Sequence, residues 1–96
     1  MESNYTDYDE IVDILKALSH PVRLCIVKGL LQQNGKCNVS HIKDCLSLPQ
    51  STVSQHLQKL KAAGIIKGKR NGLEINYTVV NETAIKIINS IFFDEN

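Results

Sequence analysis

Tryptophan is absent from this sequence of 96 residues, aromatic residues make up only 5% of it, and no apolar run is longer than a few residues. A helix that crosses a membrane needs about 20 mostly apolar residues, so the sequence predicts no membrane span. The polar and acidic start, MESNYTDYDE, is unlike a secretory signal peptide. Three cysteines, an odd number, favour reduced thiols over a disulfide framework. We therefore expect a cytoplasmic protein without a membrane partner.

The sequence also lacks the residue groupings that enzymes need. It suggests no nucleophile with a base and an orienting group, and it has no glycine-rich loop that would cradle a phosphate. No Phe, Tyr or Trp lies between Asp9 and Glu74, so the aromatic platform typical of RNA-binding domains is missing. We therefore expect neither an enzyme nor a cofactor, and we favour DNA over RNA as a nucleic-acid partner.

Acidic residues are missing from one long segment. Residues 46–72 contain no Asp or Glu, although the whole chain has ten. A basic, acid-free segment in a chain whose net charge is only +1 is typical of a surface that binds a polyanion. A solvated lysine-rich face is the alternative that charge alone leaves open. The basic residues of the segment are Lys59, Lys61, Lys67, Lys69 and Arg70.

Apolar periodicity predicts helices and one β-hairpin. Leu73, Ile75, Tyr77 and Val79 alternate with polar residues as in a strand, whereas apolar residues elsewhere recur at helical spacing. Asn71-Gly72, just before that strand, is the strongest short signal for a hairpin turn. The expected elements are helices at about 8–18, 21–32, 41–46, 50–63 and 82–93, and strands at about 65–70 and 73–79.

Two short helices on either side of Ser47-Leu48-Pro49, followed by the hairpin, outline a winged helix-turn-helix. The expected fold class is mainly α with a β-hairpin wing (α+β), in the order α-α-α-α-β-β-α. The helix-turn-helix would cover about residues 40–63 and the wing about 65–79. A chain of this length with 43% hydrophobic residues is expected to form a single domain, residues 1–96, with a modest core.

Two helix ends are marked by particular residues. Gly64 suits the left-handed position that ends the fourth helix. His20 stands before Pro21, which tolerates the first turn of a helix. We expect His20 to hydrogen-bond at the start of the second helix rather than to bind a ligand.

The fourth helix is expected to bury Val53, Leu57 and Leu60, which recur at i, i+4 and i+7. Its other positions carry hydroxyls, amides and an imidazole, which can hydrogen-bond base edges or phosphates in a major groove. A well-capped surface helix is the alternative for this stretch taken alone. The expected DNA-binding residues are Ser40, Gln50, Ser51, Thr52, Ser54, Gln55, His56, Lys59, Lys69, Arg70, Asn71 and Gly72.

The segments LKALSHPVRLCIV and LPQSTVSQHLQKLKAAGIIKGKRNGLEINYTV resemble the ArsR/SmtB family of bacterial winged-helix repressors. The resemblance covers about residues 13–79. It rests on His20-Pro21-x-Arg23-Leu24, on Gln50-Ser51-Thr52-Val53-Ser54-x-His56-Leu57 and on Ala63-Gly64. It implies a homodimer that binds imperfect palindromes in promoters, with each recognition helix in a major groove. It also implies that the first and last helices form the dimer interface.

The apolar faces of the first and last helices exceed what a chain of this size needs, so pairing them across a two-fold axis is a reasonable expectation. The half-sites would then lie about one helical turn apart. The dimerisation helices would span about 8–18 and 82–93. The expected interface residues are Ile11, Ile14, Leu15, Leu18, Ile85, Ile88, Ile91 and Phe92.

The two metal sites usual in the family are both broken. Its thiolate motif, Cys-Val-Cys-Asp, is replaced here by Asn38-Val39-Ser40-His41, and the last helix has no His for the site shared across the dimer. Cys37, His41 and Cys45 are spaced four apart and remain candidate ligands, with no evident fourth. We therefore expect no bound metal.

Thiol chemistry is a second way in which the protein could sense a signal. Cys25 lies on the apolar stripe expected for the second helix and should be buried. Cys37 is expected in a loop beside Lys36, where a thiolate is favoured, and Cys45 in the third helix, which oxidation would displace. Some family members sense oxidants through cysteines, but the pair expected there would need a cysteine in the last helix. The redox candidates are Cys25, Cys37 and Cys45.

The sequence therefore predicts a sequence-specific regulator that binds double-stranded DNA as a homodimer. Repression without a bound metal or small-molecule effector is the leading interpretation. One alternative is a thiol-responsive repressor that uses Cys37 or Cys45. Another is a protein-interaction module that kept the winged helix and lost DNA binding, although such a module would be expected to lose its basic segment.

Overall fold

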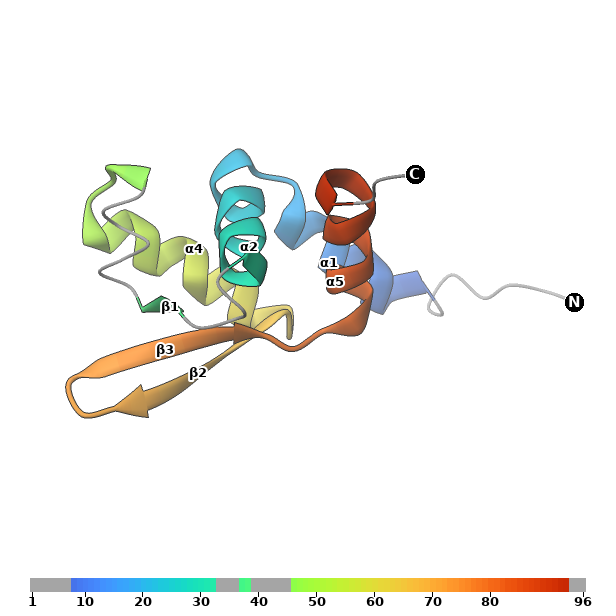
Figure 1. Cartoon of the computed structure of the whole chain (residues 1–96). Coiled ribbons are helices and arrows are strands. Elements are labelled where there is room, and N and C mark those ends of the chain that lie inside the picture. Colours follow the sequence, from blue (N-terminus) through green and yellow to red (C-terminus); the bar gives the residue numbers. More distant parts are fainter. Residues whose placement is uncertain (1–7, 33–36, 39–45, 94–96) are drawn as a thin grey trace, which may run out of the picture.

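The structure, a computed structural model, describes residues 8–32, 37–38 and 46–93. Helices gather around one apolar core, and an antiparallel sheet lies along one side of them and extends beyond them as a hairpin (Figure 1). None of the helices in these ranges is long and apolar enough to cross a bilayer. The elements are α1 Asp9–Leu18, α2 Pro21–Gln32, β1 Cys37–Asn38, α4 Gln50–Ala62, β2 Ile66–Asn71, β3 Glu74–Val79, α5 Glu82–Ile88 and the π-helical turn η2 Asn89–Phe93.

The predicted fold class, mainly α with a β-hairpin, is confirmed. The predicted third helix, residues 41–46, falls outside the described residues except for Leu46. One strand was not predicted: Cys37, expected in a loop, lies in β1 and pairs with Tyr77 of β3, which gives the sheet order β1-β3-β2. A strand of two residues is too short to show an alternating pattern, so periodicity alone does not reveal it.

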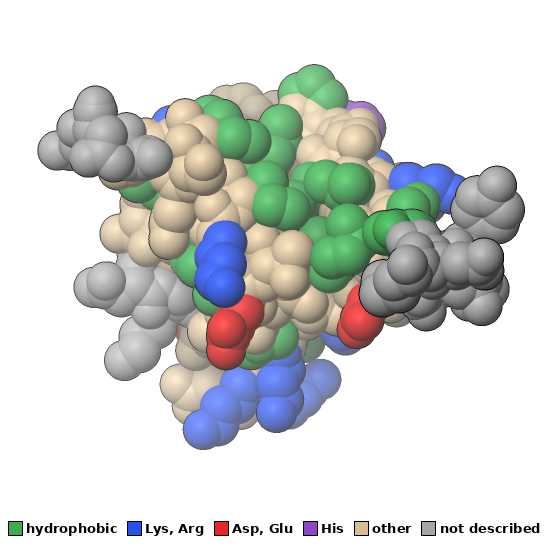
Figure 2. Space-filling view, turned by 90° about the vertical axis from the view of Figure 1, so that its right-hand side faces the viewer, with side chains coloured by type: hydrophobic (Ala, Val, Ile, Leu, Met, Phe, Trp, Pro, Cys, Tyr) green, Lys and Arg blue, Asp and Glu red, His purple; other side chains and the backbone are tan. Residues whose placement is uncertain are grey.

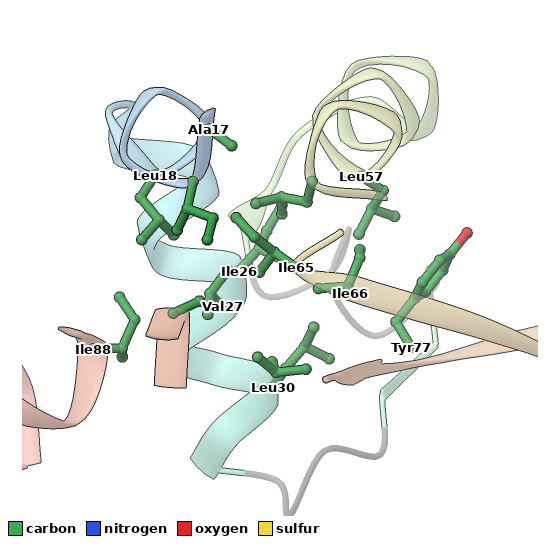
Figure 3. Close-up of a cluster of buried hydrophobic side chains, with 14 of the residues drawn as sticks. Ala17, Leu18, Ile26, Val27, Leu30, Leu57, Ile65, Ile66, Tyr77 and Ile88 are labelled. Carbon is green, nitrogen blue, oxygen red and sulfur yellow. The ribbon is translucent and has the colours of Figure 1, made fainter. Parts of the chain in front are cut away.

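The core draws on α1, α2, α4, α5 and both strands of the hairpin (Figure 3). The stripe predicted for α4 is confirmed, since Val53, Leu57 and Leu60 are at most 2% exposed. On α1 the buried face is Ile14, Ala17 and Leu18, and these side chains meet α2 and α4. The core residues are Ile14, Ala17, Leu18, Ile26, Val27, Leu30, Val53, Leu57, Leu60, Ile65, Ile66, Tyr77, Val79, Ala84 and Ile88.

The prediction that Cys25 is buried is wrong. The buried face of α2 consists of Ile26, Val27 and Leu30, and Cys25 is exposed. At 3.6 residues per turn, Cys25 lies about 140° around the helix from Leu30. The sequence prediction placed the apolar stripe one residue too early on this helix, where apolar residues occur on several sides.

The end of α4 follows the prediction for Gly64. This glycine has a φ of +77°, and its N–H donates to the Lys61 carbonyl at 2.9 Å. The next N–H, of Ile65, donates to the Leu60 carbonyl at 3.0 Å. Leu60 and Ile65 are both fully buried, which adds the apolar contact of a Schellman ending. The chain is thereby turned directly from α4 into the hairpin.

The turn of the hairpin lies one residue later than predicted. Asn71 pairs with Glu74 at the end of the ladder, so the loop residues are Gly72 and Leu73 rather than Asn71 and Gly72. Gly72 has a φ of +68°, while Asn71 and Leu73 both have negative φ. A glycine with positive φ at the first loop position is typical of a type II′ turn. The shift leaves Leu73 at the tip with its side chain 100% exposed.

Candidate nucleic-acid interface

The exposed face of α4 is polar and carries no carboxylate. Gln50, Ser51, Ser54, Gln55 and Lys59 are exposed. Ser51, Gln55 and Lys59 lie on the side opposite the buried stripe. Thr52 and His56 are partly buried at its edges. All of these residues were predicted as DNA contacts, and the fold places them on one helix. Ser40, the remaining predicted contact on the helix-turn-helix, lies outside the described residues.

The start of α4 leaves its backbone amides open to a ligand. Its N-cap residue is Pro49, which makes no side-chain capping hydrogen bond, and the first turn contains no acidic residue. The first N–H groups of a helix have no partner within the helix and carry a partial positive charge. This end of a 13-residue helix therefore suits a phosphate group.

The wing contributes a basic surface beside the polar face of α4. Lys67, Lys69 and Arg70 are exposed along β2, and Asn71 and Gly72 lead into the tip. In Figure 1 the start of α4 and the tip of the hairpin both point toward the end of the molecule opposite α1 and α5. Because β2 packs against α4, the wing holds a defined position relative to the helix.

A cluster of side chains joins α4 to the other helices. The Arg23 side chain donates from Nε to the Ala17 carbonyl at 2.6 Å, and its Nη1 lies 3.2 Å from His56 Nδ1. The rings of His56 and His20 lie 4.5 Å apart between centroids. Burial lowers the pKa of His56 below its ordinary value of 6.5, and the neighbouring His20, Arg23 and Lys59 lower this pKa further.

His20 acts as expected at the start of α2. Its Nδ1 accepts the N–H of Val22 at 3.1 Å, and its carbonyl accepts the N–H of Leu24 at 2.9 Å. Since Pro21 has no N–H, Val22 supplies the first backbone donor of the helix. The imidazole therefore serves as the cap of α2 and packs against α4 at the same time.

A separate face of the molecule is apolar. On α1 the exposed residues Ile11, Val12 and Leu15 continue the helical spacing from Tyr8, beside the stripe that faces the core. Green side chains gather across the centre of Figure 2, which looks onto the side where α1 and α5 lie. The exposed apolar residues of α1, its N-cap and η2 are Tyr8, Ile11, Val12, Leu15, Ile91 and Phe92, at 40–62% exposure.

Three residues of the predicted dimer interface are buried within the single chain. Ile14, Leu18 and Ile88 are 2%, 4% and 0% exposed and belong to the core of the single chain. Ile85 is partly buried against that core. Helical spacing alone did not separate the two stripes of α1, because the helix is apolar on two adjacent faces.

Comparison with known proteins identifies the family. The family described as "Helix-turn-helix domain" matches residues 18–69. The transcriptional repressor PagR of Bacillus anthracis is 42% identical over 90 residues, which are 91% of this chain and 89% of PagR. The repressor SmtB of Mycobacterium tuberculosis is 40% identical over 80 residues, 83% of this chain and 58% of SmtB. The chain belongs to the ArsR/SmtB family of winged helix-turn-helix repressors.

Solved structures of related proteins agree with this family. The crystal structure of PagR matches with a TM-score of 0.82 at 40% identity, over 92% of this chain and 99% of the PagR chain. A homodimeric winged helix-turn-helix DNA-binding domain from Mycobacterium bovis, described as a possible ArsR-family regulator, matches with a TM-score of 0.80 at 26% identity. That match covers 95% of this chain and 84% of the other.

The candidate ligands and thiols of this ArsR/SmtB chain fall mostly outside the described side chains. Nothing is described of the Cys37 side chain or of His41 and Cys45. Among the residues that are described, no group of three His, Cys, Asp or Glu could hold a metal ion. Cys25, the remaining redox candidate, is a free thiol on the surface of α2.

The functional residues predicted from the sequence did not include Arg23, Tyr8 or Val12. Arg23 was present in the family motif, but its spacing from α4 in the sequence gave no sign of contact with His56. Tyr8 and Val12 share a stripe with Ile11 and Leu15 at i, i+3, i+4 and i+7, a signal that the sequence already contained.

Proposed function

We propose that this protein is a homodimeric transcriptional repressor that binds double-stranded DNA at a palindromic operator. In this proposal the exposed polar face of α4 reads bases in the major groove, and the wing contacts the neighbouring backbone or minor groove. The observation that carries the proposal is the acid-free polar face of α4 beside a basic hairpin. Two comparisons support the proposal. The relative PagR is named as a transcriptional repressor, and the similar Mycobacterium bovis domain is described as homodimeric and DNA-binding.

The proposed operator has two half-sites because two copies of the chain would present two α4 helices. The apolar face of α1 and η2 is available for pairing, and it lies at the other end of the molecule from the wing tip. A dimer joined there would carry its wings outward, with one helix for each half-site. We further propose that the repressor acts without a metal or small-molecule effector, since the family's usual metal motifs are absent from the sequence.

The test is fluorescence anisotropy with double-stranded DNA enriched from a random pool by the reduced protein. We expect tight, sequence-selective binding that neither mild oxidation nor added zinc changes. Loss of binding on oxidation would favour the thiol-responsive alternative, and loss on zinc addition would point to Cys37, His41 and Cys45. Failure to enrich any sequence would contradict the DNA-binding function and favour a protein-interaction module.

A further inference from the structure

Arg23 connects three helices through one side chain. It lies in the first turn of α2, donates from Nε to the Ala17 carbonyl in the last turn of α1, and reaches His56 on α4 through Nη1. The Nε contact is 2.6 Å and the contact to His56 Nδ1 is 3.2 Å. The planar guanidinium can donate to the Ala17 carbonyl and to His56 at once, which a lysine ammonium cannot do with the same geometry.

The contact with His56 fixes the protonation state of its ring. A guanidinium has only donors and does not lose its proton in proteins, so His56 Nδ1 must accept. An accepting Nδ1 carries no proton, and the neutral imidazole then bears its proton on Nε2. The hydrogen bond from Arg23 on α2 to His56 on α4 therefore requires a neutral His56.

The second imidazole also uses its Nδ1 as a hydrogen-bond acceptor. His20 Nδ1 accepts the Val22 N–H, while the ring lies 4.5 Å from the His56 ring at an angle of 50°. A proton on His56 would remove the Arg23 hydrogen bond and place a positive charge against Arg23 and next to His20. The tilted contact between the two rings would be disturbed in the same step.

We propose that Arg23 is a positioning residue that fixes α4 against α1 through neutral His56, so that protonation of His56 weakens DNA binding. The inference rests on the proposed function, because α4 is the proposed base-reading helix. The inference goes beyond that function because it gives Arg23 and His56 a role in DNA binding that requires neither of them to contact DNA. Since α1 also carries the outer apolar face, the same junction would set the angle between the two α4 helices of a dimer.

The charges around His56 favour its neutral form. Arg23 faces it from α2, Lys59 lies one turn along α4, and His20 comes from the connection between α1 and α2. Asp13 and Lys16 of α1 line a surface pocket together with Arg23 and Lys59. Among the described residues of that lining, Asp13 is the single carboxylate, and three residues, Lys16, Arg23 and Lys59, are cationic. The positive charges near His56 agree with its lowered pKa.

A direct phosphate contact by His56 would have the opposite pH dependence. A protonated imidazole at a DNA backbone adds a charge-assisted hydrogen bond, so affinity would rise as the pH falls. Other surface groups that gain protons would also raise non-specific affinity for DNA. A fall in selective affinity at lower pH therefore distinguishes positioning through Arg23 from direct contact.

The experiment measures anisotropy with a duplex enriched at about pH 8, and repeats it down to about pH 5.5 alongside a random duplex. The main variant is His56→Asn, whose Oδ1 occupies the place of Nδ1 and accepts from Arg23 without titrating. His20→Asn keeps a cap for α2 and isolates the other ring. Arg23→Lys retains the positive charge but cannot hydrogen-bond the Ala17 carbonyl and His56 at the same time. Circular dichroism at each pH confirms that every variant is folded.

We expect the selective affinity of the wild type to fall about threefold or more toward low pH, and that of His56→Asn to change clearly less. Arg23→Lys should bind the enriched duplex weakly at every pH and lose the part of the pH response due to His56. Imidazole ¹⁵N spectra at about pH 8 should show the Nε2–H form of His56. A flat or rising wild-type affinity, a His56→Asn profile equal to the wild type, or an Nδ1–H form would each overturn the inference. Absence of selective binding at pH 8 would instead refute the proposed function itself.

Discussion

At the scale of single residues, Gln55 is the side chain on α4 best suited to read a base. It is exposed, and a glutamine amide can pair with adenine through two hydrogen bonds. We expect Gln55→Ala to lose about 1–3 kcal/mol of binding free energy on the enriched duplex and little on random DNA. Gln58→Ala is the matched control, since Gln58 is exposed on the same helix and is outside the predicted contacts. Equal losses on both duplexes would contradict base reading by Gln55.

His56 also links the stability of the fold to pH. Its pKa in the folded chain lies below the ordinary value of 6.5, so below pH 6.5 the unfolded chain binds more protons than the folded chain does. The contribution of His56 to stability is therefore complete above 6.5 and is lost as the pH falls from 6.5 through the lower folded-state pKa. Urea unfolding of wild type and His56→Asn at several pH values measures this. An identical pH dependence of the two proteins would show that His56 does not contribute.

At the scale of elements, the wing should act through charge rather than through base reading. Lys69 and Arg70 are exposed on β2, and a cation near a phosphate displaces condensed counterions when it binds. We expect Lys69→Ala and Arg70→Ala each to weaken binding to all duplexes and to reduce the salt slope by about one. The measurement is affinity at several salt concentrations, with Lys86→Ala on α5 as the control. A slope that stays at the wild-type value would exclude the wing from contact with DNA.

The hairpin depends on Gly68 for its packing. A Cβ at this position would lie 2.9 Å from Ile75 Cγ2 and 3.0 Å from Tyr77 Cε1, and Tyr77 is buried. We expect Gly68→Ala to lower the free energy of unfolding by about 1–3 kcal/mol, because the buried Tyr77 ring and the partly buried Ile75 side chain would have to shift.

Gly29 provides the comparison for that substitution. It lies within α2, and a Cβ there meets no atom within 4 Å. Gly29→Ala should raise the free energy of unfolding by about 0.5–1 kcal/mol, since alanine loses less conformational entropy in a helix. Denaturant unfolding of both variants checks the pair, and a neutral Gly68→Ala would show that the hairpin relaxes around the new methyl group.

At the scale of the whole molecule, two faces at opposite ends are proposed to serve different partners. The apolar face of α1 and η2 would pair with a second copy, and α4 with the wing would meet DNA. Leu15 is 46% exposed on the apolar face, whereas Ile88 is fully buried. We expect Leu15→Glu to raise the dimer dissociation constant by about tenfold or more with the fold intact, because a carboxylate would be buried without a partner.

Two further variants interpret that experiment. Ile88→Glu should lose the folded chain altogether, since Ile88 belongs to the core of the single protomer. Leu73→Glu, on the fully exposed wing tip, should change neither folding nor dimerisation. Sedimentation velocity with circular dichroism separates these outcomes. A folded dimer for Leu15→Glu would show that the apolar face of α1 is not the interface.

Some features of this fold could be predicted because they depend on neighbours in the chain. The buried stripe of α4, the positive φ of Gly64 and the bounds of α2 follow from local spacing and from what a glycine or proline permits. The polar face of α4 could be predicted for the same reason, because it is whatever the buried stripe leaves exposed.

Other features failed prediction because they depend on how elements pair and pack with one another. Strand β1 exists through its pairing with β3, and the hairpin loop was shifted by one residue by the register that ends at Asn71 and Glu74. Cys25 is exposed because the direction of the core, rather than the apolar residues of α2, decides which stripe is buried.

The sequence by itself determined the family, the residues on the exposed face of α4, and the order of the predicted helices and hairpin within the described residues. These features follow from periodicity and motifs, which are local properties of the chain. Only the tertiary structure decided which stripe of α1 faces the core and which faces solvent, and that Arg23 meets His56 across 33 positions of sequence. The physical reason is that packing determines which of two similarly hydrophobic helix faces is buried. A hydrogen bond between residues far apart in the sequence does not affect the local spacing of apolar residues, so that spacing does not reveal it.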